Sequence, residues 1–303
     1  MTTTRISRIL VPSDFSDTAD HALRYASDLA RTLGAQITVV YADPFVPPID
    51  YTATVGGWDE FSFINLQARA QDQLRSIAEA NIHPAVPYDV AIRVDPALDG
   101  ILTEARESKA DLIVMGTHGR TGVRRLIIGS VTETVMRYAK VPVIAVPLHA
   151  ATSAAIRTIV CPVIDKTHRL DALTIAAQIA APDARFIVML ATESDDPIQS
   201  AGDLFALHAT IPEALETRCE LKLLGDAHAG ERLESFARTV HADLIVAAEP
   251  SDRNASDMLR GTFAARLVQH SECPVMTINE LTAKVAARRA EQEAITELVC
   301  AVR

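Results

Sequence analysis

The sequence has few cysteines, no long apolar run and no excess of positive charge. The four cysteines, Cys161, Cys219, Cys273 and Cys300, all lie in the second half, without a C-x-x-C pair or a histidine at ligand spacing. Neither a disulfide scaffold nor a structural zinc or other metal site is therefore expected. No apolar segment reaches the roughly 18 to 20 residues that span a bilayer, and the start lacks the pattern of a secretory signal. We expect a cytoplasmic protein with no membrane partner.

The charge balance bears on the partners. With 29 Lys and Arg against 39 Asp and Glu, the 303-residue chain carries a formal charge of −10, and 49% of its residues are hydrophobic. This composition is typical of a globular chain of one large or two medium domains. A net anion repels the phosphate backbone, so no nucleic acid partner is expected.

The sequence contains an internal repeat, with one unit in each half of the chain. The motif R-I-L-V-P, ending at Pro12, returns as R-T-I-V-C-P, ending at Pro162, 150 residues later. The motif Ala-Asp-Leu-Ile-Val at 110–114 returns at 242–246, an offset of only 132. The first half therefore carries about 18 extra residues, which we assign to the segment 44–62, rich in proline and aromatic residues.

These landmarks predict the domain boundaries. We expect a first domain at 1–148, a second at 155–280 and a helical tail at 281–303, where apolar residues recur at near-helical spacing. The extra segment 44–62 either covers a site as a lid or packs as a surface loop. The tail docks on its own body, pairs with another subunit or frays.

Short β-branched runs alternate with amphipathic stretches in both halves, which favours an α/β fold. We predict two tandem five-stranded parallel sheets with helices on both faces. The helix at 16–33 has Ser16 or Asp17 as its cap and Gly34 as its stop, and further helices are predicted at 95–109 and 130–139. The expected strands are 6–11, 36–41, 88–94, 111–115 and 143–146, then 157–160, 185–190, 219–224, 243–247 and 275–278.

Ligands of open α/β sheets bind beyond the carboxyl ends of the strands, near helix N-termini. After the fourth expected strand the sequence has Gly116-x2-Gly119-x9-Gly129-Ser130. Glycines at 116 and 119 allow a positive φ and a close backbone approach, as a phosphate-binding loop requires. The first strand ends in Pro12-Ser13-Asp14, which places a carboxylate at a strand tip.

This set of motifs resembles the ATP-binding signature of universal stress proteins of the nucleotide-binding class, and the likeness extends over both halves. The resemblance implies a tandem protein with the adenine nucleotide alpha hydrolase-like fold and an ATP or related adenine nucleotide site in the first half, with or without Mg²⁺. The implied binding residues are Pro12, Asp14, Ala42, Met115, Gly116, His118, Gly119, Arg120, Gly129, Ser130, Val131 and Thr132.

Ordinary structural roles compete with these assignments. Asp14 could simply cap the helix that follows it, and the arginines at 120, 124 and 125 could form a solvated face. His118 is more typical of a hydrogen-bonding loop residue than of a general base, and no catalytic residue is predicted.

The second half departs from the signature. Ala248 stands opposite Gly116, Ser251 opposite Gly119 and Ile164 opposite Asp14, whereas Gly261-Thr262 is kept. Since side chains at the loop glycines would crowd a phosphate, this half is expected not to bind nucleotide in the same way, unless Asp165, one position out of register, compensates.

Three function classes remain. The first is a nucleotide-binding regulatory module for stress responses with slow or no hydrolysis, because neither a Walker lysine nor a metal cluster is found. The second is an ATP-consuming or an NAD-dependent enzyme. Such enzymes need a Ser-Gly-Gly loop or a G-x-G-x-x-G loop, respectively, after the first strand, and this sequence has neither. The third is a non-nucleotide-binding scaffold made of paired domains. By resemblance, the strands at 143–146 and 275–278 would pair the halves within one chain, and a homodimer is an alternative.

Overall fold

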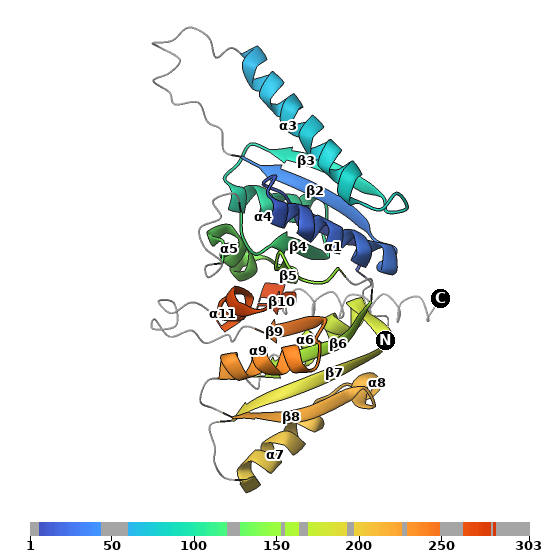
Figure 1. Ribbon diagram of the computed structural model, residues 1–303, viewed down its shortest axis with the longest axis vertical. Coiled ribbons are helices and arrows are strands. Elements are labelled where there is room, and N and C mark those ends of the chain that lie inside the picture. Colours follow the sequence, from blue (N-terminus) through green and yellow to red (C-terminus); the bar gives the residue numbers. More distant parts are fainter. Residues whose placement is uncertain are drawn as a thin grey trace, which may run out of the picture.

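The computed structural model describes residues 6–43, 60–119, 128–152, 155–163, 169–192, 197–225, 229–248, 263–279 and 281–282. Within these ranges each half is an alternation of strands and helices, as Figure 1 shows. Most of the predicted extra segment at 44–62, and all but the first two residues of the predicted tail at 281–303, lie outside the described residues. The roles expected of these two segments therefore stay predictions.

The first half contains five strands and four helices in its described part. In chain order they are β1 (Arg8–Pro12), α1 (Asp17–Leu33), β2 (Gln36–Ala42), α3 (Glu60–Asn81), β3 (Tyr88–Arg93), α4 (Ala97–Glu107), β4 (Leu112–Gly116), α5 (Ser130–Tyr138) and β5 (Val143–Val146). The expected strands of this half match these bounds to within two residues. Sequence analysis assigned no helix to 60–81. Among the residues of this helix whose burial is described, 67–81, only Leu74 and Ala78 are buried.

The second half repeats the same strand order. Its described elements are β6 (Ile156–Val163), α6 (Arg169–Ile179), β7 (Ala180–Thr192), α7 (Pro197–His208), α8 (Glu213–Glu216), β8 (Cys219–Gly225), α9 (Ala229–Thr239), β9 (Leu244–Ala248), α11 (Phe263–His270) and β10 (Val275–Ile278). All five predicted strands are present, although β7 begins five residues before its predicted start.

One sheet of ten strands runs through both halves, in the order β3-β2-β1-β4-β5-β10-β9-β6-β7-β8. The five strands within each half are parallel, as predicted. The halves join where β5 and β10 pair antiparallel, with Ala145 opposite Val275. The pairing expected from the sequence is therefore present, and the carboxyl edge of the first half lies beside the amino edge of the second.

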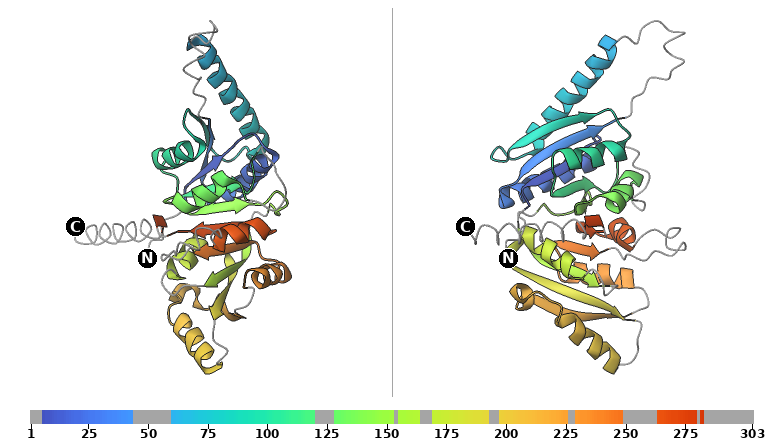
Figure 2. Two further views of the ribbon diagram at one scale, coloured as in Figure 1. Left: turned by 90° about the vertical axis from the view of Figure 1, so that its left-hand side faces the viewer. Right: turned by 180° about the vertical axis from the view of Figure 1, so that it is seen from behind.

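Helices cover both faces of this sheet (Figure 2). Alternate strand residues point to opposite faces, so Ile9 and Val11 pack in one buried cluster while Leu10 packs in the other. The first cluster includes residues of α1, α3, α6 and α7, and the second includes residues of α4, α5, α9 and α11. No helix in the described part is both long enough and apolar enough to span a membrane.

The repeated Ala-Asp-Leu-Ile-Val motif has a structural cause. In the first half, Asp111 Oδ2 accepts hydrogen bonds from the backbone N–H groups of residues 7 and 8, at 3.0 and 3.1 Å. In the second half, Asp243 Oδ2 accepts from residues 157 and 158, both at 2.8 Å. The aspartate of each unit thus ties the start of the first strand of that half to the fourth strand beside it.

A side chain from the end of the second half stabilises the seam, the boundary between the halves where β5 pairs with β10. Asn279 follows β10, and its Nδ2 donates to the carbonyl oxygens of Met136, Arg137 and Ala139 at 3.0, 3.2 and 2.9 Å. These carbonyls belong to the end of α5, where a helix leaves its last acceptors without partners of its own. Asn279 therefore acts as a cap for α5 across the boundary between the halves.

Candidate functional site

The candidate site lies where β1 and β4 end side by side. These strands are neighbours in the sheet, with Ile9 opposite Leu112. Pro12 is the last residue of β1 and is buried, and the N–H of Ser13 still bonds to the carbonyl oxygen of Val40 in β2, at 2.8 Å. The chain then leaves the sheet at Asp14 and turns into α1.

The Asp14 carboxylate supports the start of α1 without being its cap. Ser16 is the N-cap, and its side chain accepts a hydrogen bond from the N–H of Ala19. Asp14 Oδ1 in turn accepts from the Ser16 hydroxyl at 2.6 Å and from the Ser16 N–H at 3.2 Å. Of the two predicted caps, Ser16 is therefore correct, and Asp14 holds the capping residue in place.

The second carboxylate oxygen of Asp14 faces the glycine loop. A Cβ placed on Gly119 would stand 2.6 Å from Asp14 Oδ2, much closer than real Cβ atoms approach other atoms. Gly119 therefore lets the backbone after β4 pass directly against the tip of β1. The structure brings together the two motifs that sequence analysis placed at neighbouring strand ends.

At position 116, too, only glycine fits, because a side chain would collide with a neighbouring residue. A Cβ there would lie 2.7 Å from Thr18 Cγ2 and 3.0 Å from the Thr18 carbonyl oxygen in α1. Of the two properties that glycine allows here, the close backbone approach is used at Gly116 and Gly119, whereas a positive φ is not, since Gly34 is the only described glycine with one. The reason is packing: the first turn of α1 crosses so close to the end of β4 that no side chain fits.

The two ends of the glycine loop meet at the start of α5. The N–H of Gly129 donates to the carbonyl oxygen of Thr117 at 2.8 Å, and the buried Thr132 hydroxyl donates to the carbonyl oxygen of Gly116 at 2.9 Å. Gly129 is the N-cap of α5 and supplies no side-chain hydrogen bond to it. Ser130 and Val131, which follow, are exposed. The first turn of α5 therefore presents backbone donors at the carboxyl edge of the sheet.

His118 lies between these groups. Its Nδ1 is 2.8 Å from the Thr117 hydroxyl oxygen, and its Nε2 is buried with no hydrogen-bond partner among the described residues. No described carboxylate is bonded to this ring, so the geometry gives it no triad partner. The arrangement agrees with a hydrogen-bonding role better than with that of a general base.

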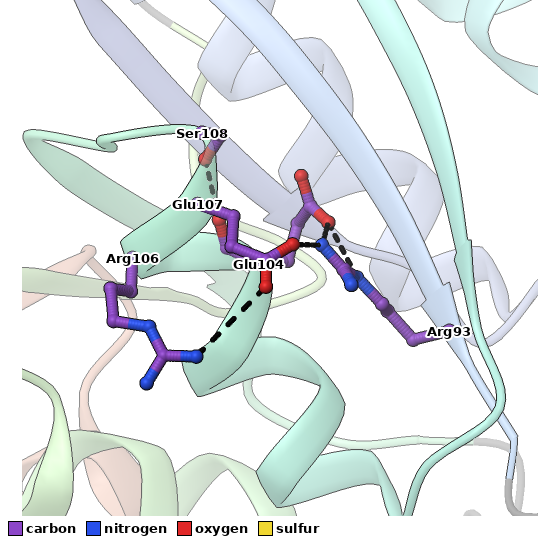
Figure 3. Close-up of polar contacts among 5 residues, drawn as sticks. All are labelled: Arg93, Glu104, Arg106, Glu107 and Ser108. Carbon is purple, nitrogen blue, oxygen red and sulfur yellow. Dashed lines mark hydrogen bonds and ion pairs between the residues drawn. The ribbon is translucent and has the colours of Figure 1, made fainter.

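The tip of β2 is held by the neighbouring helix α4. Ala42 ends β2, and a Cβ on Gly100 of α4 would stand 2.6 Å from the Ala42 Cβ. Figure 3 shows how α4 is fixed: Arg93, at the end of β3, donates through Nε to Glu104 at 2.7 Å and pairs with Glu107. These hydrogen bonds, that with Glu107 first, raise the Arg93 pKa. The ion-pair network therefore ties α4 to the end of β3, the strand beside β2.

Sequence analysis missed residues that act through contact with the motifs. Thr18 packs on Gly116, and no periodicity distinguishes it from any other residue of the first turn. Phe15 has a φ of 64°, rare for a residue with a side chain, and its ring lies 4.5 Å from that of Tyr41 between centroids. The sequence did offer one signal for Phe15: it is an aromatic residue directly after Asp14, just beyond the end of the first strand.

Several predicted groups lie outside the described residues. They are Arg120, Arg124 and Arg125 in the first half, and Ile164, Asp165, Ser251, Gly261 and Thr262 in the second. Ala248, opposite Gly116, is described as the last residue of β9. Met115 is buried in β4. Among described residues, no group of three or more His, Cys, Asp or Glu side chains could hold a metal ion.

Comparison with known proteins assigns both halves to one family. A sequence model of the universal stress protein family matches residues 5–147 and 155–279. A universal stress protein of Methanocaldococcus jannaschii is 31% identical over 139 residues, which are 46% of this chain and 81% of that protein. One from Thermus aquaticus is 36% identical over 140 residues, 46% of this chain and 96% of that protein.

The fold has a solved counterpart of similar size. The crystal structure of a universal stress protein from Archaeoglobus fulgidus matches with a TM-score of 0.67 and 15% identity, covering 91% of this chain and 97% of that one. At this identity the likeness concerns the fold, and it includes the tandem arrangement of the whole chain.

Proposed function

The chain belongs to the universal stress protein family, and we propose that its first half binds ATP or a related adenine nucleotide as a regulatory module of the stress response. The observation that carries the proposal is the contact between Asp14 and Gly119. It places a carboxylate and a loop glycine at one strand edge, beside the first turn of α5. Glycine at such a position permits a ligand's phosphates to approach the backbone.

The phosphates would lie at the start of α5. Gly129 gives this helix no side-chain cap, so the N–H groups of its first turn can donate to an anion, and the helix dipole favours negative charge there. Gly116, Gly119 and Ser130 complete this cradle in the proposal. His118, Arg120, Val131 and Thr132 would border it.

The nucleoside would lie against the strand tips. Pro12, Asp14, Ala42 and Met115 stand at the ends of β1, β2 and β4, where the Asp14 carboxylate can accept hydrogen bonds from sugar hydroxyls. Asp14 is a single carboxylate, and Mg²⁺ held by so few protein ligands would arrive with the nucleotide phosphates. We propose slow or no hydrolysis, since no carboxylate of the described residues is bonded to His118 to make it a general base.

The test combines ligand identification with a binding measurement. Gently purified protein is analysed by mass spectrometry for released nucleotide, and ATP is titrated by calorimetry into the wild type and Gly119→Val. We expect one nucleotide per chain and a loss of affinity of at least about 100-fold in the variant. The matched control is Gly202→Val in α7, where a Cβ would meet nothing within 4 Å.

Each other outcome has a defined meaning. Absence of binding by folded, nucleotide-free wild type at millimolar ATP rejects the proposal in favour of a scaffold of paired domains. Two nucleotides per chain would show that the second half binds as well, against the expectation from Ala248 and Ser251. Equal affinity in Gly119→Val would place the nucleotide away from the glycine loop.

A further inference from the structure

A separate pocket lies at the seam between the halves. It has a volume of about 320 Å³ and is lined by Tyr25 of α1, by the connection after β5, and by residues that precede β9 and β10. This volume is at the lower end of the range for small-molecule sites. None of the residues proposed to bind nucleotide lines this pocket.

The register of the sheet fixes the position of the pocket. Ala145 of β5 pairs with Val275, the first residue of β10. The pocket is lined by Ile156, the first residue of β6, and by Asp243 and Pro274, directly before β9 and β10. It therefore opens on the amino edge of the second half, which is also the carboxyl edge of the first.

Tyr25 supplies the pocket with a buried polar group. Only 3% of this residue is exposed, and its hydroxyl has no hydrogen-bond partner in the described part of the chain. Burial first of all, together with the nearby charge of Asp243, raises the Tyr25 pKa, so the phenol stays protonated. A buried hydroxyl without a partner is unfavourable, and a ligand atom that bonds to it recovers that free energy.

The charged groups of the lining select the sign of the ligand. The carboxylates are Glu234, Asp243 and Glu272, against the single guanidinium of Arg238, which pairs with Glu272 at 3.3 Å. Among these four side chains negative charge is therefore in excess. Asp243 uses one oxygen for backbone N–H groups of β6, and its charge acts at the buried end beside Tyr25.

We propose that the seam pocket is a second ligand site, which takes a small primary amine in its ammonium form with a short apolar body. The ammonium group has three N–H donors, enough to serve the Tyr25 oxygen and a carboxylate together. Its body would lie on the apolar part of the lining, formed by Ile156, Ala237, Ala242 and Pro274. An anion could accept from the Tyr25 O–H, but it would face the carboxylates of the lining.

Three probes of equal length and different charge test the site: propylamine, propionate and propanol. Saturation-transfer difference NMR at neutral pH should show saturable binding of propylamine that is at least about tenfold tighter than that of propionate. Tyr25→Phe and Ala151→Trp, a bulky change at an exposed lining position, should each weaken propylamine binding at least about tenfold. Tyr138→Phe, on the exposed face of α5, is the matched control and should bind as the wild type does.

The outcomes separate cleanly. Propionate binding as tightly as propylamine, no saturable binding of propylamine, or wild-type binding in both Tyr25→Phe and Ala151→Trp would overturn the proposal. If Tyr25→Phe fails to fold, Ala151→Trp decides alone. Added ATP should leave the propylamine signal unchanged, and displacement by ATP would assign the probe to the nucleotide site and reject a second one.

Discussion

Asp14 and Gly119 are locked together: Oδ1 of the carboxylate holds the capping residue of α1, while Oδ2 occupies the space that a side chain at 119 would need. The carboxylate cannot yield to a new methyl group without loosening its bonds to Ser16. One side chain therefore links the start of α1 to the loop after β4, two segments that are about a hundred residues apart in the sequence.

This link predicts a coupling between the two positions. Gly119→Ala should lower the free energy of unfolding by about 1 kcal/mol, because the displaced carboxylate loses hydrogen bonds. In an Asp14→Ala background the same change should cost less, with a coupling of about 0.5 to 1 kcal/mol. Urea unfolding of the four proteins measures it, and equal costs in both backgrounds would show that the contact has no energetic effect.

Two equivalent helix ends offer a stabilising change. Lys109 and His241 follow α4 and α9 at the same position of the repeat, with φ of 54° and 50°, where glycine is the usual residue. Lys109→Gly should raise the free energy of unfolding by about 0.5 to 1 kcal/mol, because relief of backbone strain exceeds the added unfolded-state entropy. Thermal unfolding tests this, and Lys140→Gly, at an exposed residue whose φ is not positive, should not stabilise.

The cap across the seam predicts a loss of stability. Asn279→Ala removes the donor of three carbonyl oxygens at the end of α5, and about 2 kcal/mol of unfolding free energy should be lost. Asn279→Asp keeps the shape but faces those oxygens with a carboxylate, so it should cost more. Chemical unfolding measures both variants, and a milder effect of Asp than of Ala would refute the capping role.

A histidine at the connection between the halves predicts a pH dependence. His21 Nε2 lies 2.9 Å from the carbonyl oxygen of Ala150, and burial first of all lowers the His21 pKa. Below about pH 6.5 the unfolded chain takes up this proton before the folded one does, so stability falls as the pH falls. His21→Gln keeps a donor without the titration, and its unfolding free energy should decline less between pH 7 and pH 5. An unchanged pH dependence would contradict the assignment.

Much of the fold is predictable because its signals are local. The repeat, the parallel strands and the helix from Ser16 to Gly34 follow from side-chain periodicity and capping residues, which depend on neighbours in the sequence. The closeness of Asp14 and the glycine loop also follows, since parallel strands end at one edge. Sequence analysis did not predict helix α3, because the apolar stripe in its described part is narrow.

The sequence alone determined the tandem α/β fold, the succession of parallel strands along each half and the strand ends at which a nucleotide site is expected. Only the tertiary structure decided why Gly116 and Gly119 are glycines, that Thr18 and Asp14 press on them, that Asn279 caps a helix of the other half, and that Tyr25 borders a pocket at the seam. These features arise where elements distant in the sequence pack within a few ångströms of one another. Periodicity records which face of an element is buried, but not which atoms meet there.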